Sequence, residues 1–189
     1  VAGASATAAA MGGLAPAASA AGIKDLWSMD LQILATSDTH GKFDPWDYAA
    51  NKADASGSVA QQATAIKENR TKTTLVVDAG DTIQANSAEL FLNDDVHPMI
   101  AAQNAIGYDI YVTGNHEYYS GAEAWVAEFS RLGLHVLLNE HVELKHDGAR
   151  LTIAGITDYS AHVFNAAWRS DPKAALAGAP ENVPKILLA

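Results

Sequence analysis

The chain has 189 residues, of which 49% are hydrophobic, and it carries a formal net charge of −10 and no cysteine. This composition is typical of one globular domain, and it excludes a disordered chain, disulfide bonds and thiolate metal sites. The negative charge, without a basic stripe, argues against a nucleic-acid polymer as a partner.

Residues 1–22 are rich in alanine and glycine and carry no charge. Ala18, Ser19 and Ala20 have the small-x-small pattern of a signal-peptidase site, and no basic segment precedes them. The pattern predicts the end of an export signal, and therefore a periplasmic, extracellular or cell-envelope protein. A flexible low-complexity linker is the alternative interpretation. No stretch of the sequence is long enough to predict a transmembrane helix.

Three apolar runs, which begin at Leu31, Thr74 and Tyr108, predict buried strands. Helical patterns at residues 58–70 and 98–106 separate these runs. The resulting order of strand, helix, strand, helix, strand predicts right-handed crossovers and a parallel sheet.

The same kind of pattern continues to the end of a single domain over residues 29–189. A further helix, a fourth strand, a hairpin around an Asp-Gly turn, a loop or short helix, and a last apolar run are expected in that order. These elements cover residues 122–132, 134–138, 142–156, 160–178 and 185–188.

Polar side chains follow each of the first three predicted strands: Asp38 and His40, then Asp81, then Asn115 and His116. Each motif alone is commonly a polar turn. Because open α/β sheets place their sites at the carboxyl ends of strands, the three together predict one metal site. Carboxylate, imidazole and amide ligands suit manganese, iron or zinc rather than calcium. We expect two divalent ions that activate water for attack on a phosphate, with a histidine that protonates the leaving oxygen or stabilises charge.

Other residues near these motifs carry weaker predictions. The aromatic loop over residues 41–57 either shapes a binding pocket or packs over the sheet edge. Glu117 is expected to be a structural hydrogen-bonding partner, Gln84 to help shape the site, and His162 to be a candidate substitute ligand.

The motifs D-x-H, G-D and G-N-H-E, in this order, resemble those of the calcineurin-like metallophosphoesterase superfamily. The resemblance implies an α/β fold, a sandwich of two mixed sheets flanked by helices. It also implies that Asp38, His40 and Asp81 hold one metal ion, that Asp81 bridges to a second ion held by Asn115, and that His116 is the catalytic histidine.

The subfamily resemblance differs between the two halves of the chain. Residues 31–115 resemble the exported 2′,3′-cyclic-nucleotide 2′-phosphodiesterase/3′-nucleotidase group of the 5′-nucleotidase family. The sequence after the third motif is more similar to the YkuE-type metallophosphoesterases, so a hybrid chain is one interpretation. Related nucleotidases often carry an acidic residue where this chain has Tyr119, and that residue orients the catalytic histidine.

Members of the superfamily continue past a strand like residues 185–188 into further histidine ligands, and this sequence ends at Ala189. The resemblance therefore implies a domain that is truncated at its carboxyl end and has an incomplete second metal site.

The prediction is a metal-dependent phosphoester hydrolase that acts on a small phosphorylated substrate, a nucleotide with a 2′,3′-cyclic phosphodiester or a 3′-phosphomonoester. One alternative is a member of the superfamily that acts on lipid or envelope phosphoesters. The other is a non-catalytic fragment that binds metal weakly or not at all.

Overall fold

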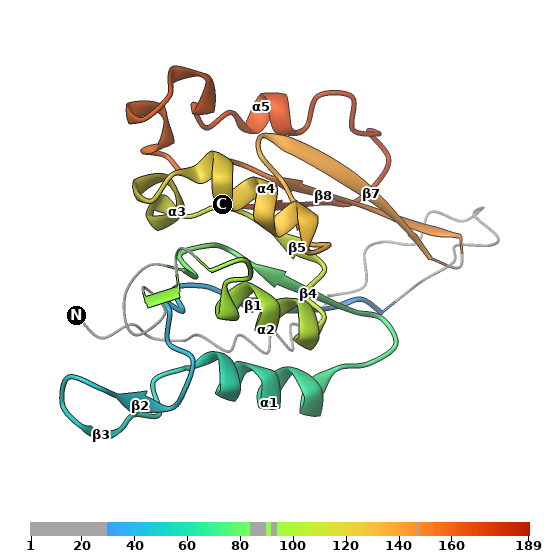
Figure 1. Ribbon diagram of the computed structural model, residues 1–189. Helices are drawn as coiled ribbons and strands as arrows, with labels where there is room; N and C mark the ends of the chain where they lie inside the picture. Colours follow the sequence, from blue (N-terminus) through green and yellow to red (C-terminus); the bar gives the residue numbers. More distant parts are fainter. Residues whose placement is uncertain (1–29, 84–89, 92–93, 147) are drawn as a thin grey trace.

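The computed structural model describes residues 30–83, 90–91, 94–146 and 148–189, which form two main sheets, a small two-stranded sheet and the helices that flank the main sheets (Figure 1). The predicted export signal at residues 1–22 and the predicted site residue Gln84 lie outside these ranges. No helix among the described residues is long and apolar enough to cross a membrane.

The first sheet contains four strands, all parallel, in the spatial order β1, β4, β5, β6. These strands are β1 Gln32–Thr36, β4 Thr74–Asp78, β5 Ile110–Tyr111 and β6 His135–Val136. Parallel neighbours need crossover connections, and helices supply them here, as the alternating pattern of the sequence predicted.

Three helices make these crossovers: α1 Val59–Asn69, α2 Pro98–Ile106 and α4 Ala122–Arg131. Helix α1 begins with a capping box, in which Ser58 and Gln61 each accept a hydrogen bond from the other's backbone N–H. Helix α2 ends at Gly107, which adopts a left-handed conformation with φ of 85°.

The second sheet is mixed. Strands β7 Glu140–His146 and β8 Ala149–Gly155 form the predicted antiparallel hairpin, and β9 Lys185–Leu188 pairs with β8 in parallel. The two-sheet α/β sandwich is thus the fold expected from the sequence, with one difference in detail. Within the described residues, the first sheet is wholly parallel and only the second is mixed.

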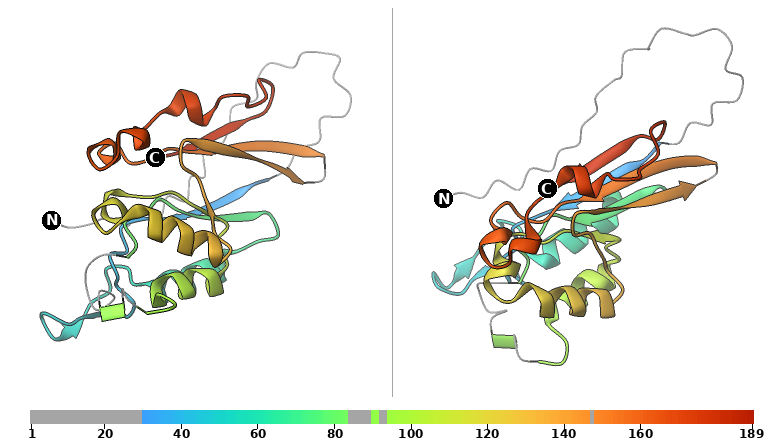
Figure 2. Two further views of the ribbon diagram at one scale, coloured as in Figure 1. Left: turned by 45° about the horizontal axis from the view of Figure 1, so that its top comes forward. Right: turned by 90° about the horizontal axis from the view of Figure 1, so that it is seen from above.

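The parallel sheet is covered on both faces. Val76 of β4 belongs to a buried cluster with Phe129 of α4, on the helical side. Its neighbours Leu75 and Val77 belong to a second cluster, with Ile153 of β8. Successive strand residues point to opposite faces, so the continuous apolar run in β4 is what a strand buried on both sides requires. In Figures 1 and 2, β7, β8 and α5 lie on the opposite side of the molecule from α1.

The remaining elements are short. They are β2 Trp46–Asp47, β3 Lys52–Ala53, α3 Asn115–Tyr119, η2 Ala161–Val163, η3 Ala166–Trp168 and α5 Pro172–Ala175. The last three occupy the region predicted as a loop or short helix, and Asp171 caps α5 by accepting from the backbone of Lys173 and Ala174 at 2.9 Å.

The loop over residues 41–57 forms the small β2–β3 hairpin. An ion pair between Lys42 and Asp54 ties its ends together, and Lys42 also donates to Ser56 at 2.8 Å. Its rings at Trp46 and Tyr48 are exposed. Packing over the sheet edge therefore does not account for these two rings.

Candidate metal-binding site

The three predicted motifs meet at the carboxyl ends of β1, β4 and β5. The backbone N–H of Asp38 donates to the carbonyl of Gly80 at 3.0 Å, and that of His40 donates to the carbonyl of Asp81 at 2.9 Å. The backbone N–H of His116 donates to Oδ1 of Asp81, also at 2.9 Å. Asp81 is therefore the residue to which both other motifs are attached.

Three of the predicted site residues have a left-handed backbone: Asp38, His40 and Asp81, with φ of 55°, 48° and 57°. This region is sparsely populated by residues other than glycine and costs about 1–3 kcal/mol for each of them. The surrounding contacts must offset this cost, and residues held in this way tend to gather at functional sites.

Two glycines allow the motifs to come this close. A Cβ atom added to Gly80 would lie 2.1 Å from the backbone nitrogen of Gly114, and one added to Gly114 would lie 2.2 Å from Oδ1 of Asp81. Real Cβ atoms do not approach other atoms this closely. The Gly-Asp and Gly-Asn-His-Glu motifs thus need their glycines for contact with each other as well as for turning the chain.

His40, Asp81 and His116 form a group that can hold a metal ion, because one ligand atom from each lies within 4.8 Å of the others. The rings of the two histidines contact each other edge to face, with centroids 4.5 Å apart. Nδ1 of His116 is buried and has no hydrogen-bond partner within the described residues. Buried polar atoms are normally hydrogen-bonded, so this nitrogen calls for a partner that the described residues do not supply.

Asp38 lies beside this group rather than inside it. Its Oδ1 is 3.7 Å from Nε2 of His40, and its side chain is 65% exposed. The contact with His40 places a carboxylate at the open edge of the site. Its predicted role as a ligand remains a prediction.

The side chain of Asn115 lies against the carboxylate of Asp81. In one orientation its amide nitrogen donates to Oδ2 at 2.9 Å and to Oδ1 at 3.2 Å, and its oxygen accepts from the hydroxyl of Tyr119 at 3.0 Å. Turned by 180°, the amide oxygen faces the two carboxylate oxygens. That second orientation brings acceptors together and is favourable only with a cation between them.

Asn115, His116 and Glu117 lie in the first turn of α3, a short helix that the sequence did not predict. Glu117 is fully buried, and its carboxylate accepts from the backbone of Gly114 at 2.8 Å, of Asp81 at 2.9 Å and of Thr82 at 3.0 Å. Burial raises the pKa of Glu117, while these N–H groups act in the opposite direction. Its expected structural hydrogen-bonding role is confirmed.

Asp78, at the end of β4, is a buried carboxyl that the sequence interpretation missed. Its Oδ2 accepts from Thr36 at 2.5 Å and from Gln103 at 3.1 Å. Its Oδ1 accepts from the backbone of Gly80 at 2.9 Å and from the hydroxyl of Thr82 at 3.0 Å. Burial raises the pKa of Asp78 to about 7 in spite of these hydrogen bonds. One sequence signal was available: Asp78 is a charged residue inside an otherwise apolar strand.

Two buried carboxyls therefore hold the turn that carries Asp81. Asp78 binds Gly80 and the Thr82 side chain from one side, and Glu117 binds the backbone of Asp81 and Thr82 from the other. Hydrogen bonds to this many backbone groups fix both the position of the turn and its left-handed conformation.

The remaining predicted contributors lie further out. His162 is exposed and bonds through Nδ1 to the carbonyl of Tyr159 at 2.8 Å, and it is not part of the ligand group found among the described residues. Tyr119 packs its ring against that of His116 at 5.6 Å. This ring contact lies where related nucleotidases are expected to use a carboxylate.

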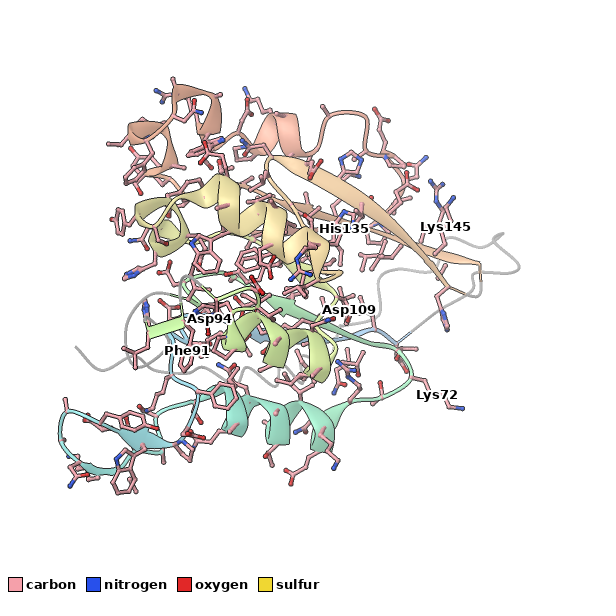
Figure 3. All side chains as sticks on the ribbon, in the orientation of Figure 1. Lys72, Phe91, Asp94, Asp109, His135 and Lys145 are labelled. Atoms are coloured by element: carbon pink, nitrogen blue, oxygen red, sulfur yellow. The ribbon has the colours of Figure 1, made fainter. Side chains whose placement is uncertain are left out.

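The donor set fits a divalent cation. It offers a carboxylate, two imidazoles and an adjacent amide, and Nδ1 of His116 is buried with no partner in the part of the chain that the structure describes. Oxygen and nitrogen ligands of this kind suit transition metals. Two positive side chains, Lys72 and Lys145, lie at the opposite end of the molecule from α3 (Figure 3), so they do not neutralise this site.

Comparison with known proteins agrees with this geometry. Residues 31–188 match the sequence profile of the family described as calcineurin-like phosphoesterase. The trifunctional nucleotide phosphoesterase protein YfkN of Bacillus subtilis is 37% identical over 105 residues, which are 49% of this chain and 7% of that protein. The 2′,3′-cyclic-nucleotide 2′-phosphodiesterase/3′-nucleotidase of Salmonella typhimurium is 31% identical over 104 residues, which are 51% of this chain and 16% of that protein.

A solved structure is also similar. The crystal structure of calcineurin-like phosphoesterase YfkN from Bacillus subtilis superposes with a TM-score of 0.62 and 25% identity, covering 72% of this chain and 51% of that chain. This chain thus spans a small part of the curated relatives and about half of the solved chain. The profile match extends from β1 to β9 and includes all three motifs. The chain belongs to the calcineurin-like phosphoesterase family, a family of hydrolases.

Proposed function

We propose that this chain is the metal-binding part of a hydrolase that cleaves phosphoesters of nucleotides, either a 2′,3′-cyclic phosphodiester or a 3′-phosphomonoester. The observation that carries this proposal is the group formed by His40, Asp81 and His116, whose ligand atoms come from three separate segments and lie within 4.8 Å of one another. The names of the relatives, which describe nucleotide phosphoesterases, favour a nucleotide over a lipid or envelope phosphoester.

In this proposal, Asp38, His40 and Asp81 hold one divalent ion, and Asp81 with Asn115 holds a second. Manganese, iron or zinc fits these ligands. When bound, such ions supply positive charge for the phosphate and lower the pKa of water. The chain itself fixes the positions of the ligands through the turn held by Asp78 and Glu117.

His116 is the proposed proton donor to the leaving oxygen. Its backbone N–H is bonded to Asp81, and its ring lies between those of His40 and Tyr119. These contacts fix the ring beside the ligand group and leave Nδ1 unpaired within the described residues. A positioned imidazole of this kind serves as a general acid.

We also propose that the protein is exported. The support is the pattern of Ala18, Ser19 and Ala20 after an uncharged stretch rich in alanine. Cell fractionation of the full chain, followed by amino-terminal sequencing, tests this proposal. A mature end directly after Ala20 supports export, and an intact amino end in the cytoplasmic fraction contradicts it.

The main test measures metal content and hydrolysis together. After dialysis against manganese, the wild type should retain the metal and hydrolyse bis-p-nitrophenyl phosphate and adenosine 2′,3′-cyclic phosphate. Asp81→Asn keeps an acceptor for the backbone N–H of His116 but removes the charge, so it should lose metal and at least about 100-fold of the turnover. Asp30→Asn, on an exposed residue before β1, is the matched control and should behave as the wild type.

Two outcomes distinguish the alternatives. Retained metal without hydrolysis of any phosphoester favours a non-catalytic metal-binding domain. Neither metal nor hydrolysis in the folded wild type contradicts the proposal. Hydrolysis of p-nitrophenyl esters with no activity toward nucleotides favours the alternative that assigns lipid or envelope phosphoesters.

A further inference from the structure

A row of aromatic rings leads from the ligand group to the surface. The ring of His116 lies 5.6 Å from that of Tyr119, which lies 5.4 Å from that of Phe164. Tyr119 and Phe164 are 53% and 46% exposed. The two rings contact each other edge to face, at 64°, so they present a corner of aromatic surface next to the proposed phosphate site.

Both rings are held in position. Tyr119 ends helix α3, and its hydroxyl lies 3.0 Å from the Asn115 amide. Phe164 follows the η2 turn, and its backbone N–H donates to the carbonyl of Ala161 at 3.1 Å. Ala161 is fully buried, in a cluster with Tyr118 of the same α3 helix. The two rings therefore belong to one packed unit, and little ordering is needed before a ligand contacts them.

Exposed aromatic residues are common on protein surfaces, so exposure alone means little. Tyr159 illustrates this, because it is in the same segment and more exposed than Phe164, but its ring contacts His162 and no residue of the ligand group. The difference for Tyr119 and Phe164 is their continuity with His116. An apolar surface that continues from a polar site is typical of a pocket that binds an organic substrate.

We infer that Tyr119 and Phe164 form the subsite for the base of the nucleotide substrate. This inference rests on the proposed function, because it places the phosphate of the same substrate at His40, Asp81 and His116. A nucleobase has a flat π-face that stacks on aromatic side chains, whereas the sugar and phosphate do not. Stacking contributes affinity without reading the pattern of hydrogen-bonding groups, so the subsite should accept purines and pyrimidines alike.

The test uses substrates with and without a base. For the wild type, kcat/KM should be higher for adenosine 3′-phosphate than for ribose 3-phosphate. Phe164→Leu keeps an apolar side chain but removes the π-face, so it should lower the first value by about tenfold and leave the second unchanged. Phe164→Trp should restore the preference for the base. Tyr159→Leu is the matched control, and it should change neither value.

A binding measurement keeps this test separate from hydrolysis. Adenosine, which lacks phosphate, should bind the metal-free protein in a saturation-transfer NMR titration, and Phe164→Leu should weaken that binding by a similar factor. Failure of the proposed function would appear as no metal and no turnover in the wild type, whatever the result with adenosine.

Three results would overturn the inference. An equal loss for both substrates would mean that Phe164 only supports the fold of the segment. Unchanged kinetics and adenosine binding in Phe164→Leu would mean that no base contacts this ring. Sedimentation that reveals a wild-type dimer, converted to a monomer by Phe164→Leu, would mean that a second copy of the chain occupies the surface.

Discussion

The loops at the carboxyl ends of β1, β4 and β5 differ from the β7–β9 sheet in how they are stabilised. The second sheet is a regular ladder, with seven aligned residue pairs between β7 and β8 and an ion pair between Glu143 and Arg150 on its surface. The loops instead carry positive φ angles, buried carboxyls and a buried nitrogen without a partner among the described residues. Three of the five non-glycine residues with positive φ among the described residues, and two buried carboxyls, are therefore gathered where the proposed chemistry occurs, whereas the second sheet covers one face of the parallel sheet.

The largest contrast should come from two glycines, one in each region. Gly114→Ala would place a Cβ atom 2.2 Å from Oδ1 of Asp81, so we expect loss of metal binding as well as several kcal/mol of stability. Gly155→Ala, in β8, would place a Cβ atom 2.5 Å from Leu137 and Val112, so it should destabilise the fold but leave the metal affinity of the folded protein unchanged. Calorimetric titration with manganese, beside thermal unfolding, measures both effects. Equal manganese affinities in the two variants would contradict the prediction that only the loops at the strand ends control metal binding.

A second contrast concerns pH. The pKa of Asp78 is about 7 in the folded protein, whereas the ordinary pKa of an aspartate is 3.8. Between these pH values Asp78 therefore keeps its proton in the folded protein and has lost it in the unfolded chain. The stability it contributes therefore falls as the pH rises from about 4 to about 7, and it changes little outside that range. Asp78→Asn does not titrate. The wild-type free energy of unfolding, relative to this variant, should thus decrease over that interval by up to roughly 4 kcal/mol.

Urea denaturation in the presence of a chelator is the measurement for Asp78, since bound metal would add its own pH dependence. Nε2 of Gln103 faces Asp78, so the Gln103 amide must turn by 180° before the amide of Asp78→Asn can donate to its Oε1, which has no partner within the described residues of the wild type. The variant should therefore fold. A difference in stability that does not change with pH would contradict the prediction.

The smallest contrast compares two glutamates. Glu117→Gln replaces one acceptor oxygen by a donor, which leaves at least one of the three backbone N–H groups around it without a partner. We expect a loss of about 1–3 kcal/mol and weaker manganese binding. Glu143→Gln, in the partly exposed pair with Arg150, should cost less than about 1 kcal/mol and leave manganese binding unchanged. Chemical denaturation and metal titration of both variants check these values, and a larger cost at Glu143 would contradict them.

Much of the fold could be predicted because its elements are long and regularly patterned. The capping box at Ser58, the terminating Gly107 and the alternation of strands and helices all have local causes, and each was found in the structure. Helix α3 was missed because it has five residues, too few for a helical period to appear. The β2–β3 hairpin was also missed, because its two-residue strands carry no apolar run of the kind that marks the equally short β5.

The candidate site divides in a similar way. The sequence predicted that His40, Asp81 and His116 lie together. Each follows an apolar strand, and parallel strands bring their carboxyl ends to one edge of the sheet. Of the support beneath them, the hydrogen-bonding role of Glu117 was predicted, but its partners and the role of Asp78 could not be, since they depend on contacts between distant residues. In the sequence, Asp78 only follows an apolar run. The structure shows that its carboxylate accepts a hydrogen bond from Gln103 of α2. The sequence likewise could not predict that the exposed Asp38 side chain lies beside the ligand group, because this depends on how the side chain is oriented.

The hydrogen bonds of Glu117 have a consequence for the order of folding. They join residues 35 and 36 positions apart in the chain, so the turn at Asp81 is unsupported until α3 has docked beside it. Closing a loop of this length costs entropy before any contact repays it, so the ligand group should be among the later parts of the molecule to assemble. During refolding, manganese binding should appear only with or after native tertiary structure. A kinetic phase of metal binding that precedes the native fluorescence signal would argue against this order.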